Sequence, residues 1–156
     1  MFLYDVVPPE MIIVGLNAEN KSGILDELTE HFCRINKSSS KNEILSAIRE
    51  REAKMSTGIL KGVAIPHALT NAVKEMHGII GISKKGISYG SLDGEPVYLV
   101  FMILSPRECS EKYLGLLTRL ATLLQKPSFY EELRVLDSSD EAYKLIKQYE
   151  ENLSIL

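Results

Sequence analysis

The sequence has little cysteine, no tryptophan and no long apolar run. Its two cysteines, Cys33 and Cys109, are too few for a disulfide framework and lack the spacing of a metal site. No apolar run is long enough to span a bilayer, and no signal peptide is recognisable. These absences predict a cytoplasmic protein that does not insert into a membrane and contacts one only through a partner.

Strong charge of either sign is also missing. The 156 residues carry a net charge of -3, and lysines and arginines are scattered along the chain. A basic stripe of the kind that binds nucleic acid is therefore not expected. The length and a hydrophobic content of 45% fit one globular domain covering residues 1–156.

Apolar runs and helical periodicities alternate along the chain, and the middle is rich in strands while the end is helical. We expect a three-layer α-β-α domain with a mixed sheet. The run at 97–104 is apolar on both faces and is predicted as the central strand. The other expected strands are 11–16, 63–65, 76–83 and 87–90, with a turn at 84–86 between the last two. The expected helices are 22–34, one from Lys41, 110–125, 129–136 and a last one capped by Ser138, while residues 1–10 are predicted as a loosely packed arm.

The stretch from Arg51 to His67 contains the candidate residues for a chemical function. Pro66 cannot donate to a sheet ladder, so the strand 63–65 should end there and present His67 at its tip. A neutral imidazole is a good nitrogen nucleophile. The cations and hydroxyls that precede it suit a phosphate: Arg51, Lys54, Ser56, Thr57 and Lys61. The alternative is a surface turn whose histidine has no chemical role.

Two further side chains lie on inward-facing helix positions. The helical wheel from Lys41 places Arg51 and Glu52 on the buried side, which predicts an internal ion pair, an arginine facing an anion site, or both. In the helix 110–125, Tyr113 starts an apolar stripe that continues through Leu114, Leu117, Leu120, Ala121 and Leu124. Its ring is either core, or it carries a hydroxyl to the phosphate site.

The motif R-E-x-x-x-S-T-G-I-x-x-G-V-A-I-P-H at 51–67 resembles the phosphorylation site of type-2 enzyme IIA domains. These domains belong to the bacterial phosphoenolpyruvate-dependent sugar phosphotransferase system, in its fructose, mannitol and nitrogen-regulatory group. The similarity continues through G-E-P-V-Y-L-V-F-M-I-L-S-P at 94–106 and D-E-A-Y-K-L-I near the C-terminus. The S-T-G form and the single-domain length are most similar to the nitrogen-regulatory branch.

The resemblance implies a function and a set of residues. His67 would accept a phosphoryl group from the histidine phosphocarrier protein, Arg51 would hold it, and Thr57, Ser56 and Tyr113 would support the site. The family has a second histidine where this chain has Tyr113. No metal or organic cofactor is needed. The next partner would be a sugar-permease IIB domain or a regulated target protein. The alternative function is a regulatory protein-binding module with weak or no phosphorylation.

Overall fold

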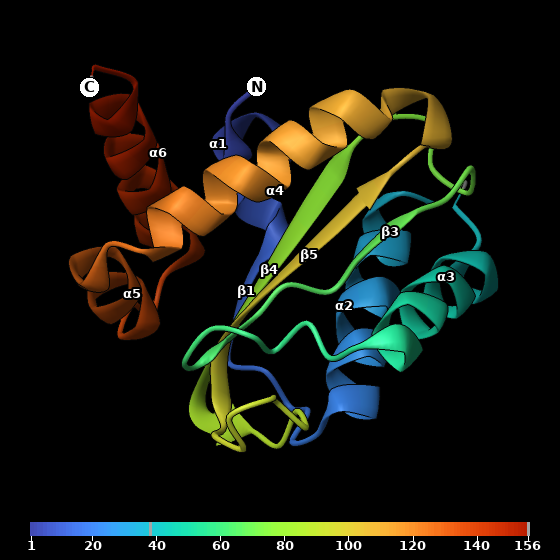
Figure 1. Cartoon of the computed structure of the whole chain (residues 1–156), viewed down its shortest axis with the longest axis horizontal. Helices are drawn as coiled ribbons and strands as arrows, with labels where there is room; N and C mark the ends of the chain where they lie inside the picture. Colours follow the sequence, from blue (N-terminus) through green and yellow to red (C-terminus); the bar gives the residue numbers. More distant parts are fainter. Residues whose placement is uncertain (38, 156) are drawn as a thin grey trace.

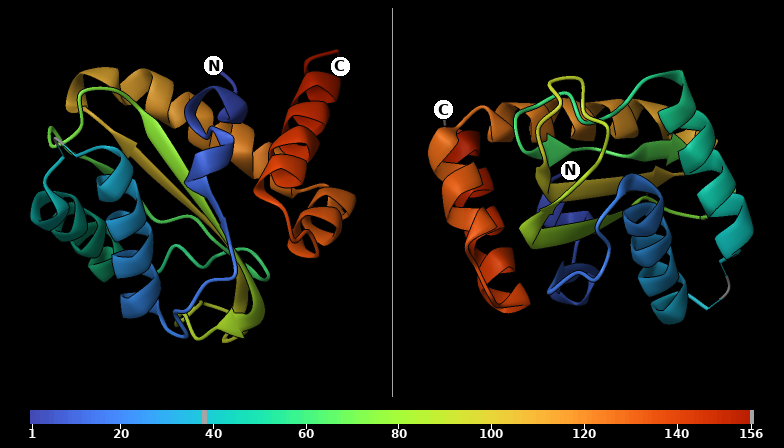
Figure 2. Two further views of the ribbon diagram at one scale, coloured as in Figure 1. Left: turned by 180° about the vertical axis from the view of Figure 1, so that it is seen from behind. Right: turned by 90° about the horizontal axis from the view of Figure 1, so that it is seen from below.

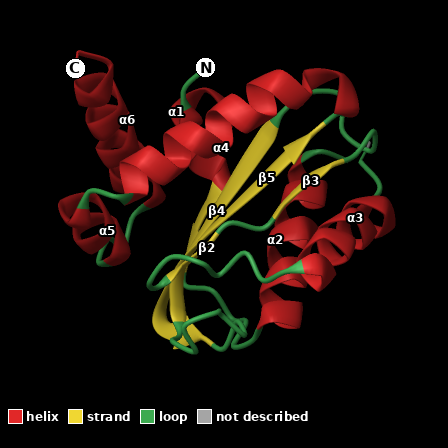
Figure 3. Cartoon of the chain, viewed as in Figure 1, coloured by secondary structure: helices red, strands yellow, loops and turns green. Residues whose placement is uncertain are grey.

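The computed structural model describes residues 1–37 and 39–155, and it contains one mixed sheet with helices packed around it (Figures 1 and 3). The strands are β1 (Ile12–Val14), β2 (Val63–Ala64), β3 (His67–Leu69), β4 (His77–Ile87) and β5 (Val97–Ser105). The helices are α1 (Leu3–Val6), α2 (Lys21–Ile35), α3 (Lys41–Lys54), α4 (Ser110–Leu124), α5 (Pro127–Arg134) and α6 (Ser139–Ile155), with short 3-10 turns η1 (Pro9–Met11) and η2 (Arg107–Cys109). Within the described residues, no helix is long and apolar enough to cross a membrane.

Strand β5 is the centre of the sheet, as its doubly apolar sequence predicts. It pairs antiparallel with β4 on one side and parallel with β2 and β3 on the other, and β1 adds to β4 in parallel. Strands β2 and β3 are two pieces of one edge, interrupted at Ile65 and Pro66. The prediction of a mixed sheet within a three-layer α-β-α domain is confirmed.

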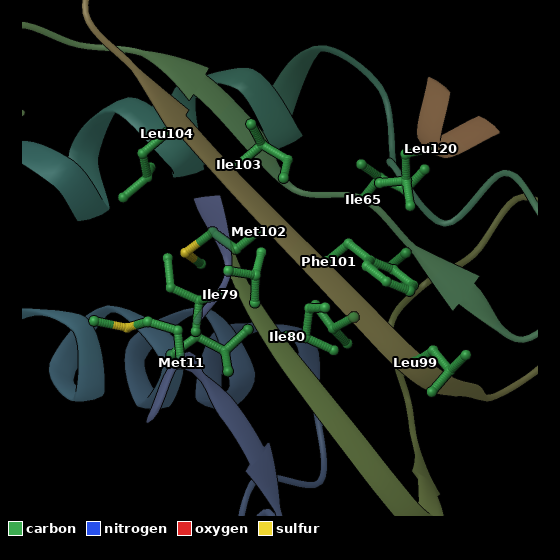
Figure 4. Close-up of a cluster of buried hydrophobic side chains, with 14 of the residues drawn as sticks. Met11, Ile65, Ile79, Ile80, Leu99, Phe101, Met102, Ile103, Leu104 and Leu120 are labelled. Atoms are coloured by element: carbon green, nitrogen blue, oxygen red, sulfur yellow. The ribbon is translucent and has the colours of Figure 1, made fainter. Parts of the chain in front are cut away.

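The two faces of the sheet are covered by different helices. Figure 2 shows α2 and α3 together on one side, with α3 beside the edge strand β3, and α4 crossing the opposite side. On β5, Met102 faces α2, where it contacts Thr29, whereas Phe101 lies on the side of Leu120 from α4 (Figure 4). Burial of side chains on both faces supplies the main stabilisation of the sheet.

Three helix starts follow the capping side chains in the sequence. The side chain of Asn20 accepts a hydrogen bond from the Gly23 amide at 2.8 Å, and α2 begins at the next residue. Ser40 accepts from the Glu43 amide at 3.3 Å, so the predicted start of α3 at Lys41 is confirmed. Ser138 accepts from the Glu141 amide at 3.3 Å in the same way at the start of α6.

The prediction of a loose N-terminal arm is wrong. Leu3, Val6 and Val7 are buried, and α1 packs against α6 and α4. The carboxylate of Glu150 accepts hydrogen bonds from the amides of Leu3 at 2.8 Å and Tyr4 at 2.9 Å. A partner 146 residues away in the sequence gives no local signal, which explains the error.

The predicted turn at 84–86 is also wrong, because β4 continues through it to Ile87. The pairing of β4 with β5 shifts its register between Ile82 and Ile87. Gly86 has a φ of 90°, a conformation that glycine tolerates, and its amide donates to the Ser83 hydroxyl.

Helix α4 is rotated relative to its predicted apolar stripe. Tyr113 and Leu120 are buried as expected, but Leu116 and Leu123 complete the buried face, and Leu114 is exposed. Leucines occupy most of the circumference of this helix, so the helical wheel does not fix its rotation.

Candidate functional site

The sequence predicts His67 at the C-terminal tip of the strand 63–65. In the structure His67 is instead the first residue of the edge strand β3. The carbonyl of Pro66 accepts a hydrogen bond from the Ile103 amide at 3.0 Å, and His67 then pairs in register with Ile103 of β5. Pro66 interrupts the edge without ending it, because the chain stays extended on both sides of the proline.

The backbone fixes which ring nitrogen of His67 is available. Its Nδ1 lies 2.6 Å from the carbonyl oxygen of Ile65. Because a carbonyl can only accept, Nδ1 carries the proton and donates it, and Nε2 keeps its lone pair in the neutral ring. The preorganised nucleophilic atom of this site is therefore Nε2.

The surroundings of His67 favour that neutral ring. The side chain is half-buried, and burial lowers the pKa of His67 below its ordinary value, with the nearby positive charge of Arg51 acting in the same direction. The Ile65 carbonyl and Glu52 oppose this shift without reversing it. At neutral pH the ring is neutral, with its proton on Nδ1, and Nε2 is able to attack an electrophile.

His67 lies in a cleft of about 400 Å³ between α3 and α4, with β3 as its floor. Arg51 reaches the cleft from the last turn of α3, where its Nη1 also donates to the carbonyl of Met55 at 2.9 Å. Lys54 and Arg107 are the other cations in the lining, and Glu50 is the carboxylate. This excess of positive charge, with guanidinium groups that match phosphate oxygens, suits a phosphoryl group.

Tyr113 reaches the same cleft from the first turn of α4. Its ring lies 5.8 Å from the imidazole of His67, centroid to centroid, with a tilt of 56°. Only 6% of the residue is exposed. Burial raises the pKa of Tyr113, so its hydroxyl is neutral and can donate one hydrogen bond. The two alternatives for Tyr113 are thus compatible, since one ring both joins the core and borders the cleft.

Ser56 and Thr57, which were predicted to support the phosphate site, are not among the residues that line the cleft. The Ser56 hydroxyl accepts from the Gly58 amide at 3.1 Å. Thr57 is buried, and its hydroxyl donates to Glu52 and lies 3.0 Å from that of Tyr89. Lys61 lines a different hollow. The S-T-G segment, residues 56–58, therefore supports the cleft from behind and does not contribute hydroxyls to its lining.

Of the predicted alternatives, an internal ion pair does form at this place, but Arg51 is not part of it. Glu52 instead pairs with Lys21 at 3.1 Å and accepts hydrogen bonds from Thr57 and Tyr89. Adjacent residues on a helix diverge by about 100°, so one of them can border the cleft while the next is buried behind it.

Arg107 is a cation of the cleft that the sequence motif did not indicate. It belongs to η2, which follows β5 directly, and its amide donates to the Asn71 side chain at 3.2 Å. Since β3 and β5 are parallel, the residues after β5 emerge at the same edge of the sheet as β3. Ser105-Pro106 indicates the end of the strand, and the position of Arg107 directly after that end was the signal that could have identified it.

The structure offers no metal centre in its described part. Among residues 1–37 and 39–155, no group of three or more histidine, cysteine, aspartate or glutamate side chains could hold a metal ion. The donor set of the cleft is cationic, which suits an anion.

Comparison with known families identifies the family to which the chain belongs. The family described as "Phosphoenolpyruvate-dependent sugar phosphotransferase system, EIIA 2" matches residues 5–149, and the chain belongs to this family. Phosphoryl transfer through a phosphohistidine is a general property of the family. The resemblance inferred from the motif at 51–67 is confirmed.

Two relatives show the range of proteins to which the chain is similar. It is 33% identical over 150 residues to a fructose-specific EIIABC component of Bacillus subtilis, covering 96% of this chain but 24% of that protein's length. It is 28% identical over 146 residues to a nitrogen regulatory protein of Bradyrhizobium diazoefficiens, covering 94% of this chain and 95% of the relative. The chain thus matches one part of the first relative and nearly all of the second.

Solved structures agree with this assignment. The nitrogen regulatory protein IIA-Ntr from Neisseria meningitidis superimposes with a TM-score of 0.84 at 27% identity, covering 92% of this chain and 97% of the other. The mannitol IIA of Escherichia coli gives a TM-score of 0.72 at 21% identity over 88% and 96% of the two chains, which supports the fold alone. A mannitol IIA of Escherichia coli is also known in complex with phosphorylated enzyme IIB.

Proposed function

We propose that this chain is a phosphoryl carrier of the phosphotransferase system, with His67 as the acceptor and a regulatory role. The observation that carries the proposal is the state of His67, whose Nδ1 is bound to the Ile65 carbonyl while the ring lies in a cationic cleft. A neutral nitrogen nucleophile beside fixed positive charge is what phosphoryl transfer from a phosphohistidine requires.

The transfer step follows from this geometry. The Nε2 lone pair of His67 attacks the phosphorus atom in line with the leaving nitrogen of a phosphorylated histidine phosphocarrier protein. The new N–P bond forms as the donor's N–P bond breaks, and the electron pair of that bond returns to the donor ring. The other nitrogen of the donor ring carries a proton, so the donor leaves as a neutral imidazole and the positive charge passes to the phosphorylated ring of His67. The proton on Nδ1 of His67 stays in place and continues to bind the Ile65 carbonyl.

Arg51 stabilises the transferring group. Its guanidinium enters the cleft that contains His67, and its planar fork can bind two equatorial oxygens at once. Lys54 and Arg107 add positive charge to the same lining, and Tyr113 offers a neutral hydrogen bond. No metal or organic cofactor enters this step.

The nitrogen regulatory relative covers nearly the same length as this chain, which favours a regulatory role. The onward partner is then a regulated target protein. The alternative partner is a sugar-permease IIB domain, because a mannitol IIA of the same fold forms a complex with its enzyme IIB.

A second candidate function is a regulatory protein-binding module that is phosphorylated weakly or not at all. Tyr113 favours it, because the neutral phenol at this position cannot share the charge of the phosphoryl group as an imidazolium would. The two functions differ in the extent of phosphorylation under a saturating donor.

The test is phosphorylation with purified components. The chain is incubated with phosphoenolpyruvate, enzyme I and the histidine phosphocarrier protein, and its intact mass is measured. We expect one acid-labile phosphoryl group on the wild type and on His31→Gln, because His31 lies outside the cleft with its Nε2 against the Glu10 carbonyl. His67→Gln should stay unmodified. Equal labelling of His67→Gln and wild type would refute the assignment of the acceptor.

A further inference from the structure

A buried carboxylate lies directly behind the cleft. Glu52 is 7% exposed, and it accepts hydrogen bonds from the Thr57 amide at 3.3 Å, from the Thr57 hydroxyl, and from the Tyr89 hydroxyl at 2.7 Å. The ammonium group of Lys21 lies 3.1 Å from the same carboxylate. The cluster of Glu52, Thr57, Tyr89 and Lys21 therefore joins the end of α3 and the start of α2 to the S-T-G segment.

The carboxylate in this cluster is ionised. Burial by itself raises the pKa of Glu52, but the hydrogen bonds from Thr57, Tyr89 and Lys21 outweigh that effect and lower the pKa. An ionised acceptor makes stronger hydrogen bonds than a neutral one, so Glu52 holds the Thr57 amide and hydroxyl firmly.

A continuous series of hydrogen bonds runs from this cluster to the nucleophile. The carbonyl of Thr57 accepts from the Ile65 amide at 3.2 Å. The carbonyl of Ile65 in turn accepts from Nδ1 of His67 at 2.6 Å. Ile65 lies in the gap between β2 and β3, so Thr57 takes the place that a neighbouring strand would otherwise fill for its amide.

We infer that Glu52 is a positioning residue for phosphoryl transfer, acting through Thr57 and the Ile65 peptide to keep His67 protonated at Nδ1 and free at Nε2. The inference rests on the proposed function for its kinetic consequence. Glu52 is not among the residues that line the cleft bordered by Arg51, so it does not touch the phosphoryl group.

A purely structural role for Glu52 would have different consequences. Removing one partner of a buried ion pair destabilises a protein, because the other partner is left without its counter-charge. A structural carboxylate would therefore affect the unfolding temperature and leave the ring of His67 unchanged. The chain supplies a matched control in Glu150, which is fully buried and accepts from the amides of Leu3 and Tyr4 and from Arg119.

The experiment compares Glu52→Gln with Glu150→Gln in the whole chain. The first measurement is the tautomer of His67, read from long-range ¹H–¹⁵N spectra of the unphosphorylated protein. The second is the single-turnover rate of phosphorylation by the phosphorylated phosphocarrier protein, and the third is thermal unfolding. Both variants should unfold at lower temperature. Only Glu52→Gln should lower the population protonated at Nδ1 and slow transfer, by about three- to thirtyfold, the scale of one or two weakened hydrogen bonds.

Thr57 provides a second pair of variants if Glu52→Gln folds poorly. Thr57→Val removes the hydroxyl and keeps the backbone carbonyl, and it should shift the tautomer in the same direction by a smaller amount. Thr57→Ser keeps the hydroxyl and should behave as wild type. The inference is overturned if Glu52→Gln, or Thr57→Val in its place, leaves the tautomer unchanged, or if Glu150→Gln changes it equally.

The tautomer measurement needs no donor protein, so it separates the two hypotheses. If wild type is not phosphorylated but Glu52→Gln shifts the tautomer, the proposed function fails while the positioning role of Glu52 stands. If wild type is phosphorylated and Glu52→Gln changes neither tautomer nor rate, only the positioning role fails.

Discussion

Replacing Tyr113 tests how the cleft compensates for a missing second histidine. The ring lies 5.8 Å from the imidazole of His67 and is almost fully buried, so Tyr113→Phe keeps the packing and loses only the hydroxyl. A neutral hydrogen bond to the phosphoryl group is worth about 0.5–1.5 kcal/mol. Tyr113→Phe should therefore shift the phosphorylation equilibrium by only about two- to tenfold toward the unphosphorylated form.

Tyr113→His should act in the opposite direction. An imidazolium at this position adds a charged hydrogen bond to the phosphoryl group, and such bonds are worth about 1.5–3 kcal/mol. After subtraction of the hydrogen bond that tyrosine already makes, the phosphorylation equilibrium should shift roughly three- to thirtyfold toward the phosphorylated form. The smaller ring leaves some space in the core, so we expect a loss of about 1–2 kcal/mol in the free energy of unfolding.

The assay is the phosphorylation equilibrium of the three proteins against one donor, followed by intact-mass analysis. Tyr130→Phe is the matched control, because Tyr130 lies over Gly62 in a different hollow. Equal equilibria for tyrosine, phenylalanine and histidine at position 113 would refute the reasoning. Tyr113 would then be an ordinary core residue, and the protein-binding alternative would lose its main support.

Two other predictions concern the charge of the cleft and the protonation of His67. Arg51→Lys keeps the charge but loses the bidentate fork, so the rate of transfer should fall by roughly ten- to a thousandfold. The circular dichroism spectrum should stay unchanged, because the fold does not depend on the fork. An unchanged rate would leave Arg51 without a role in transfer. Because the pKa of His67 is lowered by burial, the transfer rate should be level at neutral pH and fall only below the ordinary histidine pKa of about 6.5. The lowered pKa of His67 also affects stability. The free energy of unfolding should decrease as the pH falls below the ordinary histidine pKa, because the unfolded chain binds a proton there more readily than the folded chain does. A rate profile centred above the ordinary pKa would contradict this account.

Local signals in the sequence were sufficient for the framework of the fold. The apolar run that became β5 fixed the centre of the sheet, because only a strand covered on both sides is apolar on both faces. Ser40 fixed the start of α3 through a side-chain cap. The motif at 51–67 led to Arg51 and His67, which the structure brings into one cleft.

Interactions between distant residues were not predictable in the same way. The N-terminal helix is held by Glu150, and Glu52 is held by Lys21 and Tyr89 rather than by its neighbour Arg51. The rotation of α4 depended on packing against the sheet, because its leucines cover most of its circumference. Arg107 joined the cleft through the parallel pairing of β3 with β5, which the sequence did not specify.

The most direct test of this account is the identity of the phosphorylated atom. The chain is labelled with ¹⁵N, phosphorylated through the phosphocarrier protein, and studied by long-range ¹H–¹⁵N spectra with detection of the coupling between ¹⁵N and ³¹P. We expect the phosphoryl group on Nε2 of His67, with Nδ1 still protonated and bound to the Ile65 carbonyl. A phosphoryl group on Nδ1 of His67, or on any other residue, would contradict the account.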